Sequence, residues 1–85
     1  MTNLLHHSIA YEMTVREKKT RVEWVEDVPQ KLNFKTAPDI TEMGPVSRAK
    51  ESIKWWNQTK RDYENERELV TVRRVTTDVI YDADV

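Results

Sequence analysis

The sequence predicts a small α+β domain, in which an N-terminal hairpin and a C-terminal strand form a small antiparallel sheet packed on one long helix. Three observations predict this class. Large apolar residues alternate with polar ones near the N-terminus, a helical apolar stripe follows residue 45, and valine and threonine are frequent before the C-terminus. The 85 residues should form a single domain, residues 1–85, with frayed ends at about 1–7 and 82–85.

The N-terminal hairpin is predicted from a period of two. Every second residue from Ile9 to Val15 is apolar, which is the pattern of a half-buried strand over residues 8–15. A charged run follows, and the alternation restarts over residues 20–25. The two segments indicate a hairpin, although no Asn-Gly or Asp-Gly turn separates them and one long bent strand is the alternative.

A long connection is predicted at residues 27–45, which hold all three prolines and the only glycine. Its spaced apolar residues, Leu32, Phe34, Ile40 and Met43, are expected to pin it across the core. Long loops without regular structure are often either functional or disordered, and the sequence leaves both possibilities open.

One long helix is expected from Pro45 to about Arg67, because proline suits the first turn of a helix. Its apolar stripe comprises Val46, Ala49, Ile53, Trp56 and Tyr63. Neighbouring residues point about 100° apart around a helix. We therefore expect Trp56 in the core and Trp55 at its edge, partly exposed.

The C-terminal strand is expected over residues 69–81, which are rich in valine, threonine and isoleucine. Its apolar residues change face at Arg73 and Arg74, so a bulge or bend is expected there. This strand is longer than either strand of the hairpin. Part of it should therefore lack a partner within the chain and invite a second strand.

Composition argues against several classes of function. Fourteen basic and fifteen acidic residues give a net charge of −1, so no long-range field gathers the chain onto nucleic acid or a membrane. The lack of cysteine suits a reducing cytoplasm, and neither a signal peptide nor a membrane span is expected. A single glycine excludes a Walker loop and a dinucleotide fingerprint. Adjacent His6 and His7 would face opposite ways in a strand. We expect a cytoplasmic, non-enzymatic protein without cofactor, catalytic or metal site.

Charge is unevenly distributed along the expected helix. Residues 45–61 are mainly basic and residues 62–68 mainly acidic. Cations near a helix N-terminus and anions near its C-terminus oppose the helix dipole, at a cost of about 0.3 to 1 kcal/mol each. The pattern either orients a partner or is a distribution that tertiary packing outweighs, and we favour the second interpretation.

Exposed tryptophan is uncommon without a partner, so Trp55 and the free edge of the sheet mark the expected binding surface. The predicted partner-binding residues are Arg48, Lys54, Trp55, Thr59, Val75, Val79 and Tyr81. The function expected from them is binding to another protein, as an accessory or modulator. Self-association into a homodimer, as a structural or assembly component, is an alternative.

A nucleic-acid-binding module is the other alternative, because basic groups could hold phosphates while Trp55 stacks on a base. The candidate residues are Lys50, Lys54, Lys60, Arg61, Arg73 and Arg74. For the two arginines of the strand, the simpler interpretation is cross-strand pairing with Glu12 or Glu23. Nucleic acid is therefore the less expected partner.

The C-terminal half also resembles a known group of proteins. The residues concerned are Ser47-Arg48-Ala49-Lys50, Trp55-Trp56, Glu66-Arg67-Glu68 and the strand from Leu69 to Thr77. Over residues 45–81 this order resembles small accessory proteins encoded by bacteriophages of Gram-positive hosts. The resemblance implies a cytoplasmic protein, expendable to the host, that binds and modulates a host protein or has no assigned role.

Overall fold

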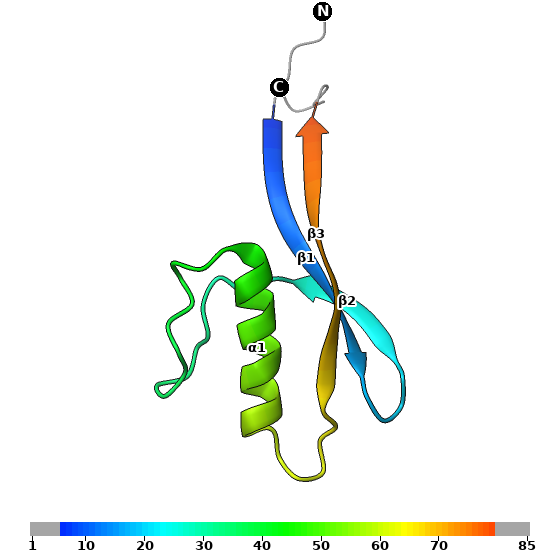
Figure 1. Cartoon of the computed structure of the whole chain (residues 1–85). Helices are drawn as coiled ribbons and strands as arrows, with labels where there is room; N and C mark the ends of the chain where they lie inside the picture. Colours follow the sequence, from blue (N-terminus) through cyan, green and yellow to red (C-terminus); the bar gives the residue numbers. More distant parts are fainter. Residues whose placement is uncertain (1–5, 80–85) are drawn as a thin grey trace, which may run out of the picture.

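The computed structural model describes residues 6–79, with side chains described for 8–77, and confirms the predicted α+β class (Figure 1). The elements in chain order are β1 (His6–Glu17), β2 (Glu23–Asp27), α1 (Pro45–Thr59) and β3 (Arg67–Val79). The antiparallel sheet has the order β2-β1-β3, so β1 is central, and α1 packs against one face. None of the described helical structure has the length and apolar character that a membrane crossing requires.

The predicted hairpin is confirmed, and the alternative of one long bent strand is wrong. β1 and β2 pair antiparallel, with Val15 opposite Trp24. Main-chain hydrogen bonds close the turn, from the Glu17 N–H to the Val22 carbonyl (2.9 Å) and from the Arg21 N–H to the Glu17 carbonyl (3.0 Å). Arg21 has a φ of 65°, in the left-handed region, so an arginine makes the turn that Asn-Gly usually makes. β2 consequently begins later than predicted.

The core lies between α1 and the helix-facing side of the sheet. Its buried cluster consists of Met13, Val15, Val28, Ala49 and Ile53. Ala49 and Ile53 come from the predicted helical stripe, but Trp56 does not join them. Trp56 is half-buried, like Trp55, because the sheet opposite it presents the guanidinium of Arg67 instead of an apolar side chain. The prediction of Trp56 as a core residue is therefore wrong.

α1 ends at Thr59, well before the predicted end, and Lys60 leaves the helix with a ψ of 154°. A turn follows in which the Glu64 N–H donates to the Arg61 carbonyl and the Arg61 N–H donates to the Glu64 carboxylate, both at 2.9 Å. Tyr63, predicted on the helical stripe, lies in this turn and is 76% exposed. The helix is shorter because this turn offers its main chain other hydrogen bonds.

The acidic residues after the helix therefore do not oppose its dipole. Glu66 pairs with Lys18 at 3.3 Å, and Glu68 pairs with Arg16 at 3.0 Å. Exposed pairs of this kind stabilise by about 0 to 1 kcal/mol each. Glu66 and Glu68 thus connect the start of β3 to β1 and the turn that follows it. A helix with a basic first half and an acidic second half, as considered from the sequence, is not formed.

β3 contains a β-bulge at Val70, not at the neighbouring arginines as predicted. Thr14 pairs with Thr71 and Val15 pairs with Leu69, which leaves Val70 without a counterpart on β1. The extra residue changes the alternation of faces along β3. Leu69 and the residues beyond the bulge can therefore both pack against the core.

The two arginines of β3 lie in a regular part of the ladder, opposite Glu12 and Tyr11 respectively. The guanidinium of Arg73 pairs with the Glu12 carboxylate at 3.0 Å. The cross-strand interpretation is therefore confirmed for Arg73. Arg74 is exposed on the other face of the sheet.

β3 pairs with β1 along the whole length of both strands. The prediction that part of β3 lacks a partner strand is wrong, because β1 is itself 12 residues long and pairs with β3 throughout. β2 covers β1 only from Glu12 to Arg16. Residues 6–10 of β1 and 75–79 of β3, which we call the ribbon, therefore project as two strands beyond α1 (Figure 1).

The connection between β2 and α1 contains no helix or strand and is held against the body of the domain. Ile40 is fully buried, and the Arg48 guanidinium donates to the carbonyls of Pro29 (3.1 Å) and Met43 (2.8 Å). Phe34, expected to pin the connection, is instead 66% exposed. The anchoring prediction therefore holds for Ile40 but not for Phe34.

Candidate binding groove

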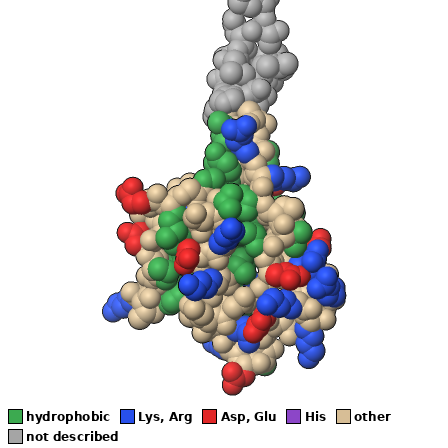
Figure 2. Space-filling view, viewed as in Figure 1, with side chains coloured by type: hydrophobic (Ala, Val, Ile, Leu, Met, Phe, Trp, Pro, Cys, Tyr) green, Lys and Arg blue, Asp and Glu red, His purple; other side chains and the backbone are tan. Residues whose placement is uncertain are grey.

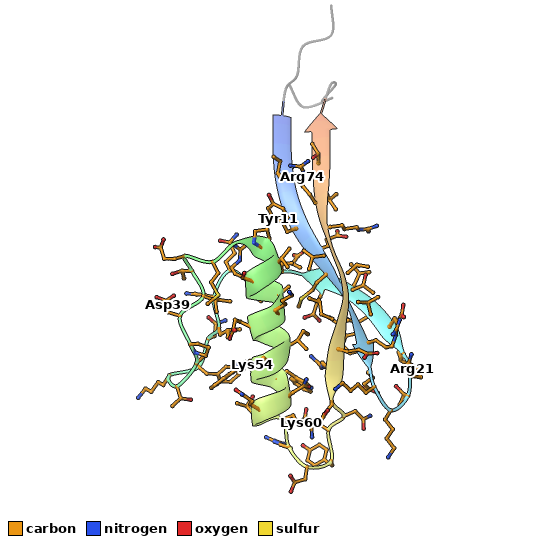
Figure 3. All side chains as sticks on the ribbon, viewed as in Figure 1. Tyr11, Arg21, Asp39, Lys54, Lys60 and Arg74 are labelled. Atoms are coloured by element: carbon orange, nitrogen blue, oxygen red, sulfur yellow. The ribbon has the colours of Figure 1, made fainter. Side chains whose placement is uncertain are left out.

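A groove of about 590 Å³ opens beside the C-terminal half of α1, where the connection runs alongside the helix (Figure 3). We call it the aromatic groove, because Phe34 of the connection and Trp55 and Trp56 of α1 line it. Met13 and Ile53 join it to the core. Hydrophobic and charged side chains are interspersed on the face seen in Figure 2.

Phe34 and Trp55 form an aromatic pair at the groove. Their ring centroids are 6.3 Å apart and the ring planes are tilted by 43°. The Trp55 Nε1 atom is buried and has no hydrogen-bond partner among the described residues. An unsatisfied buried donor costs about 1 to 3 kcal/mol. The groove therefore combines exposed aromatic surface with a donor that lacks an acceptor.

Trp56 stacks on the guanidinium of Arg67, the first residue of β3. The Arg67 Cζ atom lies 3.5 Å from the Trp56 ring centroid and 4.9 Å from the Trp24 ring centroid. The Trp56 indole N–H donates to the Asn65 carbonyl at 3.0 Å. The Arg67 guanidinium of β3 thus contacts one indole from α1, Trp56, and one from β2, Trp24. Its Nε atom is buried and has no hydrogen-bond partner among the described residues.

Asn57 positions this arginine from the helix. Its side-chain amide donates to the Arg67 carbonyl (2.9 Å), and its oxygen accepts from the Arg67 N–H (2.8 Å). The amide therefore makes the two bonds that a neighbouring strand would make with this residue. These two hydrogen bonds hold Arg67, and with it the stacked Trp56 ring, in place at the side of the aromatic groove.

Charged groups of both signs surround the aromatic surface. Lys60 and Arg61 line the groove together with Glu26, Asp27 and Glu64. Mixed charges favour a ligand that carries both signs or neither, and they give no strong preference for a polyanion.

The predicted partner-binding residues are only partly brought together. Trp55 and Thr59 line the groove, and the Thr59 hydroxyl donates to the Trp55 carbonyl at 2.7 Å. Lys54 is exposed on α1. Arg48 is instead occupied by the two carbonyls of the connection. Val75, on β3, is not among the residues that line the groove.

Among the predicted strand residues, Val75 is half-buried on β3. Val79 belongs to β3, but its side chain is outside the described set, and Tyr81 lies outside the described residues altogether. The sequence therefore combined two separate surfaces, the aromatic groove and the edge of the sheet, into one predicted site.

The basic residues of the nucleic-acid alternative do not form a single surface. Figure 3 shows Arg74 on β3, next to the ribbon, and Lys60 at the opposite end of the molecule, at the C-terminal end of α1. Arg73 is paired with Glu12, and the Arg61 guanidinium donates to the Tyr63 hydroxyl at 2.7 Å. Lys50 and Lys54 are exposed on α1.

Two carboxylates with lowered pKa values lie outside the groove. Hydrogen bonds from the Thr20 hydroxyl and the Asn65 amide hold the pKa of Glu17 below its ordinary value. The Thr41 N–H and hydroxyl do the same for the pKa of Asp39. Both effects follow from hydrogen bonds to the charged carboxylate, which come from within the turn at Asp39 and from both the turn and the distant Asn65 at Glu17. Among the side chains that the structure describes, no group of three or more His, Asp or Glu is placed to hold a metal ion.

Two groove residues, Phe34 and Arg67, were not predicted as site residues. Phe34 carried a usable signal, since a large aromatic in a proline-rich connection is either an anchor or an exposed contact. Arg67 carried no such signal in the sequence, because its role depends on where α1 ends.

No family model, curated protein or solved structure matches the chain.

Proposed function

We propose that the protein is a non-enzymatic binding domain that holds a segment of another protein in its aromatic groove. The observation that carries the proposal is the contact between the exposed Phe34 and the half-buried Trp55, whose buried indole N–H has no partner among the described residues. Aromatic side chains and arginine are the residue types that dominate binding energy at protein interfaces. An open groove next to a rigid helix suits a side chain inserted from a partner.

The chemistry of the groove favours a peptide segment with an apolar side chain and charges of both signs. The apolar group would pack between the connection and α1, and Glu64 and Lys60 would face the flanking charges. A main-chain carbonyl of the segment would be the natural acceptor for the Trp55 N–H, which has no partner among the described residues. A host protein remains the partner that the resemblance to phage accessory proteins implies.

Nucleic acid is the second candidate, because Lys60 and Arg61 line the same groove as the aromatic rings. A single-stranded segment would stack on the aromatics while the two cations contact phosphates. The neighbouring carboxylates and the net charge of −1 weigh against this candidate.

The test is affinity capture from a bacterial lysate, with and without nuclease, using three forms of the chain. Phe34→Ser removes an exposed ring and should leave the fold intact, and Lys35→Ser is a matched change at the neighbouring exposed position. We expect a protein that the wild type and Lys35→Ser capture and that Phe34→Ser loses, independently of nuclease. Capture that Phe34→Ser retains would contradict the groove. Capture that nuclease abolishes would favour nucleic acid.

A further inference from the structure

The direction of the main-chain groups can be assigned along the central strand. The Glu17 N–H donates to Val22, and the Tyr11 carbonyl accepts from Val28, both on the side of β2. Alternate residues of an antiparallel strand direct their N–H and C=O to opposite sides. Odd-numbered residues of β1 therefore face β2, and even-numbered residues bond to β3.

The same rule assigns the two edges of β3 beyond the bulge. Val75 lies opposite Ala10, an even-numbered residue, so its main-chain groups bond to β1. Val79 faces β1 in the same way. Arg74 and Thr76 therefore direct their N–H and C=O outward, away from β1.

Little protects this outer edge. Asn57 occupies the main-chain groups of Arg67, but no other side chain that the structure describes hydrogen-bonds the main chain of β3. The segment from Thr71 to Thr77 contains neither proline nor lysine, the commonest protections of an edge strand, and its charged residues are Arg73, which pairs with Glu12, and Arg74. Its residues are mainly valine and threonine, which suit pairing with another strand.

We propose that a second copy of this chain adds to the outer edge of β3 in antiparallel orientation, with Val75 on the two-fold axis. The outward-facing residues beyond the bulge are Val72, Arg74, Thr76 and Asp78. In this register all four engage, because Arg74 lies opposite Thr76 of the second copy and Val72 lies opposite Asp78 of the second copy. The pairing extends the sheet across both copies, independently of the aromatic groove.

Pairing length and charge together select this register over its neighbours. An axis at Thr76 would place Arg74 opposite Asp78 of the second copy, but it would shift Val72 opposite a position beyond the end of β3 at Val79, so fewer outward-facing residues would engage. An axis at Arg73 or at Arg74 would place identical arginines directly opposite each other, which is destabilising. An axis at Val75 places each of them opposite a threonine, Arg73 opposite Thr77 and Arg74 opposite Thr76 of the second copy, and it pairs two β-branched side chains at the centre. A second copy satisfies these conditions by symmetry, whereas another protein would need a matching strand.

The shape of the chain permits this pairing. The ribbon projects beyond α1, and no helix, strand or loop of the described chain lies beside β3 there, on the side opposite β1 (Figure 1). Antiparallel pairing places the helix of the second copy at the far end of its own ribbon. The described bodies of the two copies, each with its helix, therefore lie at opposite ends of the shared sheet.

A cysteine cross-link tests the axis directly, because the chain has no cysteine of its own. Residues of a non-hydrogen-bonded antiparallel pair have Cα atoms about 4.5 Å apart, which a disulfide can bridge. Under mild oxidation Val75→Cys should form a covalent dimer, and the matched Thr77→Cys should not, because Thr77 lies opposite Arg73 of the second copy. Equal cross-linking of the two variants, or none, would overturn the proposal.

Proline and alanine at one position provide the second test. Thr76→Pro deletes an outward N–H and leaves the ladder to β1 intact, and Thr76→Ala keeps that N–H. Sedimentation should show dimers of the wild type and Thr76→Ala, with dimerisation weakened about tenfold or more in Thr76→Pro.

Hydrogen exchange on the wild type is a third test, which needs no variant. The Arg74 and Thr76 amides should gain protection as concentration rises, whereas the Val75 amide should be protected throughout. A monomer at all concentrations, whose Arg74 and Thr76 amides gain protection only with another protein, would assign the edge to that protein and refute a second copy.

Discussion

The two tryptophans of α1 are adjacent and both half-buried, yet their replacement should have different costs. The indole of Trp56 donates a hydrogen bond to Asn65 and stacks on Arg67. The indole of Trp55 packs near Phe34, and its buried N–H has no partner among the described residues. The comparison of Trp56→Ala with Trp55→Ala therefore isolates the interactions that join α1 to β3.

The magnitudes follow from these contacts. Loss of a fully buried aromatic costs about 3 to 5 kcal/mol, and half-burial gives about 2 kcal/mol for either indole. Trp56→Ala adds about 1 kcal/mol for the hydrogen bond and about 0.5 to 1 kcal/mol for the stacked guanidinium. Its total is about 3 to 4 kcal/mol, a large part of the stability of a small domain. Trp55→Ala also removes an unsatisfied donor, so its net cost should be about 1 kcal/mol.

Urea unfolding followed by far-UV circular dichroism measures both costs without dependence on tryptophan fluorescence. Trp56→Phe is the matched control, since it keeps an aromatic ring against Arg67 and loses the N–H, at about 1 kcal/mol. A cost for Trp55→Ala equal to or above that for Trp56→Ala would refute the reasoning. Arg67 would then not be the main connection between helix and strand.

Three other changes test separate parts of the structure. Asn57→Ala should cost about 1 to 2 kcal/mol in urea unfolding, against less than about 0.5 kcal/mol for the exposed Gln58→Ala, and equal costs would show that the amide does not hold β3. The lowered pKa of Glu17 contributes stability that is full above the ordinary glutamate pKa and is lost as pH falls through the lowered value. Glu17→Gln should therefore flatten the acid limb of a stability–pH curve, and an unchanged limb would contradict this. We expect the wild type not to bind nucleic acid at physiological salt, so Lys54→Glu should make no difference in a binding assay. Tight, salt-sensitive binding by the wild type would reverse that expectation.

Local patterns predicted those elements whose boundaries depend on local chemistry. The alternation from Ile9 to Val15 predicted the central strand, because Met13 and Val15 on one of its faces are buried in the core. Pro45 predicted the first residue of α1, since its ring fixes the backbone for a first helical turn. These signals need only neighbouring residues, and the sequence contains them in full.

The features that the sequence did not predict depend on contacts between distant residues. The helix ends at Thr59 because the Arg61–Glu64 turn competes for the chain, and no glycine or proline marks the place. The bulge lies at Val70 because Leu69 and Val72 must both reach the core, a demand that comes from the sheet as a whole. The change of face at the two arginines was a true signal of irregular pairing, but its position was set elsewhere.

The bulge also separates the two proposed surfaces. Before Val70, β3 is joined to α1 through Arg67 and borders the aromatic groove. Beyond it, the strand pairs only with β1 and presents the outer edge. A dimer through that edge would leave both grooves open, at opposite ends of a sheet twice the size of the single three-stranded one. Two grooves at a fixed separation bind a partner with two matching segments more tightly than either groove alone, provided that the spacer between the segments spans the dimer. A short spacer would remove this advantage, because neither groove can move toward the other along a continuous sheet.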